Sequence, residues 1–183
     1  MSLTDKIEEV LVIPDGFSVN IENRDITISS PDGKITRNFK DHRVNIDITN
    51  DKIVLSADLP DKRKKALLGT YRSHIQNMVD GLQESFTYKL KIICSHFPVK
   101  VRAEKNEVVI ENFIGEKKPR KAKILEDVKV NIQGDLITVS SENIEKAGQT
   151  AANIEAATKI KKVDPRVFQD GIYIIEKAGK PLR

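Results

Sequence analysis

The chain has 183 residues, of which 39% are hydrophobic and 32% charged, and its formal net charge is +4. This composition is typical of a globular protein and not of a disordered one. No apolar segment approaches the roughly 20 residues that a membrane-spanning helix needs, and the N-terminal residues lack the layout of a secretory signal. The single cysteine, Cys94, cannot form an internal disulfide, and we expect it to be buried as a small hydrophobic side chain. We therefore expect a cytoplasmic protein with no membrane partner.

The first half of the chain predicts short strands followed by one helix. Pro31 and Gly33 indicate a hairpin turn, because proline presets one backbone angle and glycine allows a positive one. From Leu68 to Leu82 the apolar residues step by three and four, which predicts a helix capped by Asp58 or Asp61. Short apolar or alternating stretches predict the strands. These stretches are residues 8–13, 19–21, 26–28, 44–48 and 53–55.

The second half of the chain repeats this plan. Residues 17–21 return as residues 97–101, and residues 51–56 return as residues 135–140. A helix is predicted again, with an apolar face from Ile144 to Thr158 and with Ser141 as its cap. The predicted strands are residues 87–93, 99–101, 108–110, 128–132, 137–139 and, after the helix, 171–175.

A repeat that keeps its order from strands to helix indicates two copies of one folded unit. We therefore predict an α+β protein with two duplicated units, each a mostly antiparallel β-sheet packed against one α-helix. The predicted N-terminal unit is residues 1–84, and the predicted C-terminal unit, with a basic tail, is residues 85–183.

The two copies differ in charge. Residues 1–90 have a net charge of −1, and residues 91–183 have a net charge of +5. The second copy has the basic run 117–123 where the first has the tight turn 31–34. Because clustered Lys and Arg side chains contact phosphates, this run favours nucleic acid over a solvated loop. Another basic run, 62–65, opens the first predicted helix, where a phosphate contact and a solvated surface turn stay equal alternatives.

The composition also bears on how a nucleic acid would be bound. Aromatic residues make up only 5% of the chain and tryptophan is absent, so stacking on single-stranded bases is not the leading mode. Recognition of folded RNA through its shape and backbone fits better.

Motifs for catalysis or metal binding are not found in the sequence. His42, His74 and His96 have no Cys or His partner at ligand spacing. Nucleotide-binding and hydrolase signatures are missing. We therefore expect no enzyme, no cofactor, no metal site and no small-molecule substrate. An enzyme would need a pair of carboxylates in a pocket, which no motif marks.

Five motifs follow one another in the order found in a known family. They are Arg43–Ile46, Gly69–Met78, Tyr88–Lys91 with Ser95–Pro98, Gly148–Ile154 and Asp164–Tyr173. With them the chain resembles, over essentially its whole length, the universal large-subunit ribosomal protein L-six family in its archaeal and eukaryotic form. The resemblance implies a two-domain protein that binds large-subunit rRNA near the base of the sarcin-ricin loop, where translational GTPases dock. It also implies RNA contacts mainly from the C-terminal domain, and neighbouring large-subunit proteins as partners.

Twelve residues are candidates for contact with the RNA. The basic runs supply those expected to neutralise phosphates, which are Lys117, Lys118, Arg120, Lys121, Lys161, Lys162 and Arg166. The resemblance implies a C-terminal signature that fixes the register on the RNA, made of Gln169, Asp170, Gly171 and Tyr173. Arg72 matches the first-helix signature, and packing on the sheet and a link to rRNA are equal alternatives for it. The alternative function is a protein-interaction module that uses exposed sheet edges.

Overall fold

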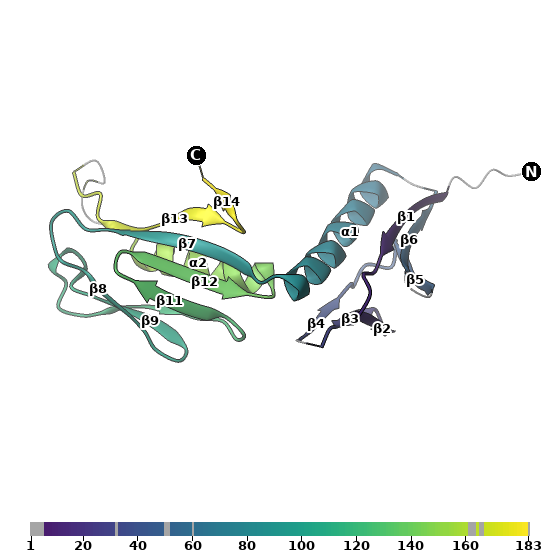
Figure 1. The fold of residues 1–183 in the computed structure, drawn as a ribbon. Coiled ribbons are helices and arrows are strands. Elements are labelled where there is room, and N and C mark those ends of the chain that lie inside the picture. The colour runs from purple at the N-terminus through teal and green to yellow at the C-terminus, as the bar shows by residue number, and fades with distance from the viewer. Residues whose placement is uncertain are drawn as a thin grey trace, which may run out of the picture. The chain divides into compact units, whose positions relative to one another are not determined.

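The computed structural model describes residues 6–31, 33–49, 52–59, 61–160, 164 and 167–182. The chain divides into two compact units, residues 1–84 and 85–183, and each consists of strands packed with one helix (Figure 1). The predicted α+β class with duplicated units is confirmed. Within the described ranges, no helix has the length and apolar character needed to cross a membrane.

The first unit has two antiparallel sheets and one long helix. Its elements are β1 (Lys6–Val12), β2 (Ser18–Glu22), β3 (Asp25–Ser29), β4 (Lys34–Asn38), β5 (Asn45–Thr49), β6 (Lys52–Asp58) and α1 (Lys62–Gln83). The sheets have the strand orders β1-β6-β5 and β2-β3-β4.

The first core lies between these sheets and α1. Leu68, Tyr71 and Ile75 of α1 are buried, on the face that their spacing predicts. Asp61, and not Asp58, caps the helix, because its carboxylate accepts a hydrogen bond from the Lys64 amide at 2.6 Å.

The second unit repeats this arrangement and extends it. Its elements are β7 (Phe86–Ile93), β8 (Lys100–Ala103), β9 (Glu107–Glu111), the 3₁₀ turn η1 (Phe113–Gly115), β10 (Arg120–Lys123), β11 (Lys129–Gln133), β12 (Leu136–Ser141), α2 (Ile144–Ala157), β13 (Gly171–Lys177) and β14 (Lys180–Pro181). The order β7-β12-β11 matches β1-β6-β5, and β8-β9-β10 matches β2-β3-β4. The difference is that β13 and β14 extend the larger sheet beyond β7.

The core of the second unit lies between α2 and the strands. Leu90, Ile137 and Ile154 are fully buried in it. Asn143, and not the predicted Ser141, caps α2, because its side-chain oxygen accepts from the amides of Glu145 and Lys146. Ser141 is instead the last residue of β12, and its hydroxyl donates to the carbonyl of Asp127 at 2.9 Å.

Two further predictions about the second unit are corrected by the structure. Cys94 is exposed, because it follows the last residue of β7 and lies in the connection to β8, outside the sheet. The basic run 117–123 is only in part a loop, since its last four residues form β10. The alternation of Lys121 and Lys123 with the buried Ala122 is the pattern of a half-buried strand.

Candidate nucleic-acid interface

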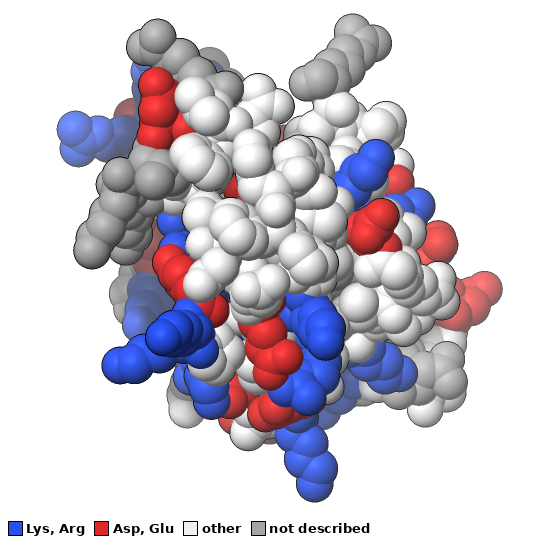
Figure 2. All heavy atoms as spheres, turned by 90° about the vertical axis from the view of Figure 1, so that its left-hand side faces the viewer, with Lys and Arg blue, Asp and Glu red and all other residues white. Residues whose placement is uncertain are grey.

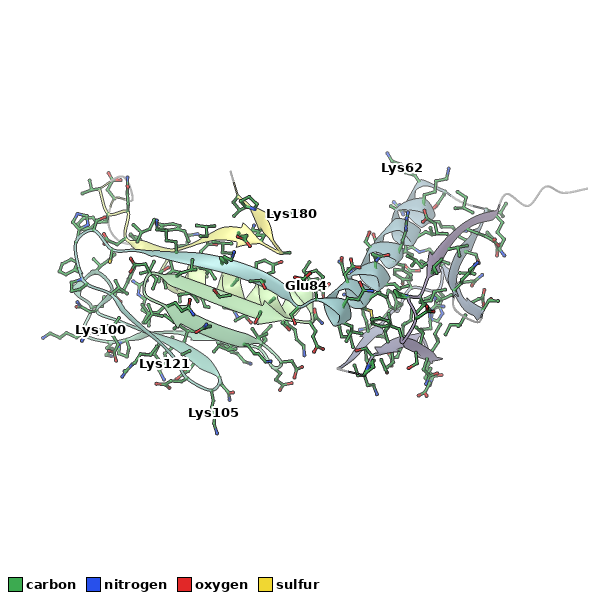
Figure 3. The ribbon with its side chains drawn as sticks, viewed as in Figure 1. Lys62, Glu84, Lys100, Lys105, Lys121 and Lys180 are labelled. Atoms are coloured by element: carbon green, nitrogen blue, oxygen red, sulfur yellow. The ribbon has the colours of Figure 1, made fainter. Side chains whose placement is uncertain are left out.

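Cationic side chains lie on one face of the sheet β8-β9-β10. Lys100 and Arg102 on β8 and Lys121 and Lys123 on β10 are exposed, and Figure 3 shows Lys100 and Lys121 projecting from this part of the second unit. Two of the four are neutralised locally, because Arg102 pairs with Glu111 on β9 and Lys121 pairs with Glu107 on the same strand. The hydrogen bond and charge of Glu107 raise the pKa of Lys121. Among the described residues, Lys100 and Lys123 make no ion pair.

The connection between β9 and β10 presents two more lysines. Lys117 and Lys118 are exposed there, and neither makes an ion pair with a described residue. Phe113 in this connection is buried, and residues before and after it in the chain contact the 94–99 segment. The Asn112 side chain donates to the carbonyl of Pro98 at 3.0 Å, and a Cβ on Gly115 would lie 3.3 Å from the Phe97 ring. A rigid support of this kind limits the entropy that the lysines lose when they bind a ligand.

Arg120 faces the protein itself. Its guanidinium lies 4.4 Å from the centre of the Phe113 ring and pairs with Glu116, with nitrogen–oxygen distances of 2.6 and 2.8 Å. It also donates to the carbonyls of Ala157 and Lys159, at the C-terminal end of α2, at 2.9 and 3.2 Å. The Ala157 carbonyl, in the last turn of α2, lacks a helix partner and lies at the negative end of the helix dipole. Arg120 therefore holds the β9–β10 connection against α2.

Asp170 also holds the structure together. Its side chain is buried, and its carboxylate accepts from the amides of Ser95 and His96 at 2.5 and 3.0 Å and from His96 Nδ1 at 2.6 Å. Burial acts to raise the pKa of Asp170, but the bonds from His96 and Ser95 outweigh it, and the pKa is lowered from 3.8. The carboxylate thus fixes the β7–β8 connection, residues 94–99, to the start of β13.

The other residues of the C-terminal signature show why position 171 is a glycine. A Cβ on Gly171 would lie 2.9 Å from the Tyr173 ring, because residues two apart on a strand share a face. The Tyr173 hydroxyl donates to the carbonyl of Gln169 at 3.3 Å, and 41% of the residue is exposed. Gln169 is exposed just before β13. The Tyr173 ring and Gln169 therefore remain accessible to a partner, whereas the Asp170 carboxylate does not.

The remaining candidates lie elsewhere. Arg72 on α1 forms an ion pair with Glu9 on β1 at 3.0 Å, which supports the packing alternative, although its side chain is 56% exposed. Lys161, Lys162 and Arg166 lie outside the described residues.

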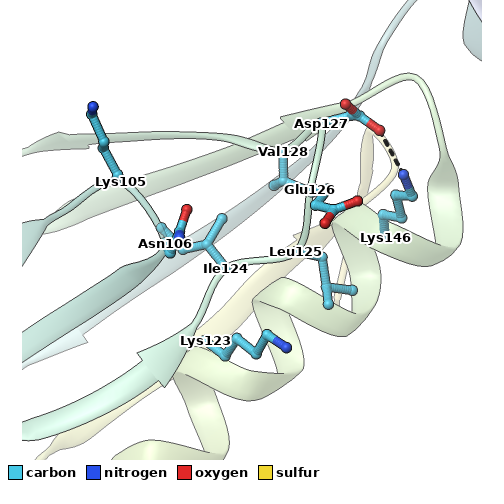
Figure 4. Close-up of a pocket in the computed structure, with 9 residues that line it drawn as sticks. All are labelled: Lys105, Asn106, Lys123, Ile124, Leu125, Glu126, Asp127, Val128 and Lys146. Carbon is cyan, nitrogen blue, oxygen red and sulfur yellow. Dashed lines mark hydrogen bonds and ion pairs between the residues drawn. The ribbon is translucent and has the colours of Figure 1, made fainter.

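A groove of about 670 Å³ runs beside α2 (Figure 4). Lys105 and Lys123 line it, and Lys146 lines it while paired with Asp127 at 2.6 Å. Glu126 and Asp127 add negative charge, so the groove as a whole is of mixed charge. Sequence reasoning did not single out Lys105, and it included Lys123 in the basic run 117–123 without naming it among the twelve candidates. The signal for Lys123 was its position two residues after Lys121, which places both on one face of a strand.

Comparison with known proteins identifies the chain. The sequence model of the family described as Ribosomal protein L6 matches residues 13–85 and 97–171, once in each unit. The protein named large ribosomal subunit protein uL6 in Methanococcus vannielii is 48% identical over 96% of this chain and 97% of its own. Proteins of that name in Methanobrevibacter smithii and Archaeoglobus fulgidus are 46% and 48% identical, each over 93% of this chain, and over 96% and 89% of their own lengths.

These matches first define a class, a structural protein of the ribosome in the cytoplasm and not an enzyme, as expected from the sequence. Within that class the chain belongs to the ribosomal protein L6 family, which confirms the resemblance seen in the five motifs.

Proposed function

We propose that this protein is a structural constituent of the large ribosomal subunit and binds large-subunit rRNA mainly through its second unit. The observation that carries the proposal is a contrast of charge between two copies of one fold. The first unit has 12 Lys and Arg against 14 Asp and Glu, and the second has 19 against 13. Because the scaffold is shared, the added cations are a departure that a polyanionic partner explains.

Lys117 and Lys118 make the leading phosphate contacts in this proposal. Both are exposed on a connection held by Asn112 and Arg120. Lys121 contributes less, because Glu107 neutralises part of its charge. Further phosphate contacts come from the segment that follows α2 in the chain, through Lys161, Lys162 and Arg166. Phosphate contacts position a protein without reading sequence, so specificity comes from the shape of the RNA.

The family resemblance supports a more specific proposal for the site on the subunit. The five motifs support rRNA near the base of the sarcin-ricin loop, close to the region where translational GTPases dock. Gln169 and Tyr173 contact the RNA directly, and Asp170 and Gly171 set the backbone that presents them. Neighbouring ribosomal proteins are the further partners.

A salt titration tests the proposal with the whole chain. The RNA is a transcript of the large-subunit rRNA segment that carries the sarcin-ricin loop, and an unrelated hairpin of equal length is the reference. We expect the logarithm of the association constant to fall linearly with the logarithm of salt concentration. At each salt concentration the affinity for the sarcin-ricin transcript should be higher than the affinity for the unrelated hairpin. An affinity that barely changes with salt would refute the phosphate contacts.

Matched substitutions then test which unit binds. We expect the double variant K117Q/K118Q to reduce the salt slope by about 2, since each lost phosphate contact reduces it by about 1. The control is K34Q/K40Q, which removes two exposed lysines from the first unit. Equal losses in the two variants would contradict the assignment of binding to the second unit.

One observation favours a second candidate function for the first unit. Among the described residues, no strand pairs with the outer edge of β1, whereas β13 covers the same edge of β7 in the second unit. Val10 and Val12 on β1 are 52% and 69% exposed. Such an edge can pair with a strand of another protein. Loss of subunit incorporation on V10K/V12K, with rRNA affinity unchanged, would support protein contacts there.

A further inference from the structure

Phe97 differs from its counterpart in the other copy of the fold. Phe17 holds the equivalent position in the first unit, 80 residues earlier, and packs against the first core. Phe97 is 39% exposed and lies outside the cluster of buried residues that forms the second core. The duplicated position is therefore partly buried against the core in the first unit and exposed in the unit that carries the cations.

The exposed ring lies on a rigid support. The connection 94–99 is fixed through the buried Asp170 carboxylate, which accepts hydrogen bonds from Ser95 and His96. The Phe97 ring itself rests on the backbone of Gly115, and His96 lies against Phe168 with ring centres 4.9 Å apart. An exposed aromatic side chain that is held in place presents a ready binding surface at little entropic cost.

Three lysines lie close to this ring along the chain. Lys100 follows Phe97 by three residues, and Lys117 and Lys118 follow Gly115 by two and three, which is within roughly 11 Å along the chain. Two acids close to Gly115 in sequence are already paired, Glu116 with Arg120 and Glu111 with Arg102. In Figure 2, an uncharged area occupies the middle of the view, and Lys and Arg side chains gather below it with acidic ones between them.

We propose that Phe97 is a stacking platform for one unpaired nucleotide of the bound RNA, whose flanking phosphates lie against Lys100, Lys117 and Lys118. The proposal rests on the rRNA binding proposed above and adds a base contact to it. A base presents a π-face that an aromatic ring can stack on whatever its sequence. The apolar ring with lysines beside it fits a base whose flanking phosphates contact the lysines. A protein segment would be attracted to these lysines only through its own acidic side chains.

The test compares Phe97→Leu with Phe97→Tyr and with Phe17→Leu in the whole chain. Leucine keeps apolar bulk and removes the ring, tyrosine keeps the ring, and the Phe17 variant makes the same change in the other copy. We expect F97L to weaken binding of the sarcin-ricin transcript at least about fivefold, the lower end of what one stacked base contributes. The salt slope should stay unchanged, because no phosphate contact is lost. F97Y and F17L should bind as the wild type does.

A chemical footprint supplies the second readout. We expect one unpaired nucleotide to be protected from base-specific modification by the wild type and by F97Y, and to be exposed with F97L. Urea unfolding of each variant checks that the fold is retained.

The outcomes separate this proposal from the function beneath it. If F97L binds like the wild type while K117Q/K118Q binds weakly, the stacking platform is refuted and rRNA binding stands. If the wild type shows no salt-dependent binding of the transcript, the proposed function itself fails. If F97L binds RNA normally but no longer enters the subunit, the ring contacts a protein, and the stacking proposal is overturned.

Discussion

Replacing Asp170 tests whether one buried carboxylate fixes the β7–β8 connection. The carboxylate accepts three hydrogen bonds, two from backbone amides and one from the His96 ring. Asp170→Ala removes all three. Asp170→Asn keeps an oxygen for the two amides and changes only the contact to His96 and the charge.

The structure sets the size of these effects. Breaking a buried charged pair typically costs ~3–5 kcal/mol. Ser95 and His96 are exposed, so water can reach the donors that are set free, and we expect D170A to cost about 3 kcal/mol, at the lower end. We expect D170N to cost about 1 kcal/mol, because a hydrogen bond to a charged group is replaced by a neutral one.

The effect depends on pH in a defined direction. Because the pKa of Asp170 is lowered from 3.8 in the folded state, the ionised carboxylate stabilises the fold above the unfolded value. This stability is lost as the pH falls through the lower, folded pKa. The difference in the free energy of unfolding between the wild type and D170N is therefore largest at pH 7 and becomes smaller below about pH 4.

Urea unfolding at pH 7 and at pH 3 measures these differences. The matched control is Glu126→Gln, an exposed carboxyl whose loss should change the free energy of unfolding by less than about 0.5 kcal/mol. If D170A costs less than about 1 kcal/mol, or if D170N costs as much as D170A, the carboxylate does not hold the connection as described.

Two further substitutions test individual contacts. Arg120→Lys should destabilise the protein by about 2 kcal/mol in urea unfolding, because an ammonium group cannot pair with Glu116 and reach the helix carbonyls together; a change below about 0.5 kcal/mol would show that these contacts are not needed. Gly171→Ala should cost about 1 kcal/mol, since the Tyr173 ring must swing away from the new methyl group. In the Y173S background the same change should cost less, and equal costs would rule out the ring as the cause.

The sequence predicted the architecture well because the architecture is periodic. The step of three and four from Leu68 to Leu82 and the alternation within strands depend only on neighbouring residues. The repeat then doubled the evidence, since each element of one unit was seen again in the other. Such patterns locate elements and buried faces before any tertiary contact is known.

The site was less predictable because charge in a sequence does not say what a side chain faces. Arg120 and Lys117 belong to one basic run, yet Arg120 turns to Glu116 and the end of α2 while Lys117 is exposed. Asp170 was read as part of an RNA signature, but its partner His96 lies 74 residues away in the chain. Cys94 was predicted to be buried because of its residue type. It is exposed because β7 ends at Ile93, one residue earlier, and residue type alone does not locate the end of a strand.

The place of β13 beside β7 has a consequence for synthesis. In the first unit every strand pairs within residues 6–58, so its sheets can form as soon as that stretch has left the ribosome. In the second unit, Ile93 on β7 pairs with Gly171 on β13, which is synthesised much later. Contacts between residues so far apart in the chain form slowly. Domains fold as units in the order of their synthesis. The sheet β8-β9-β10, which carries Lys117 and Lys118, pairs within residues 100–123 and does not need β13. The 94–99 connection, by contrast, gains its anchor only after Asp170 has been added, so the part of the RNA surface around Phe97 is the last to take shape.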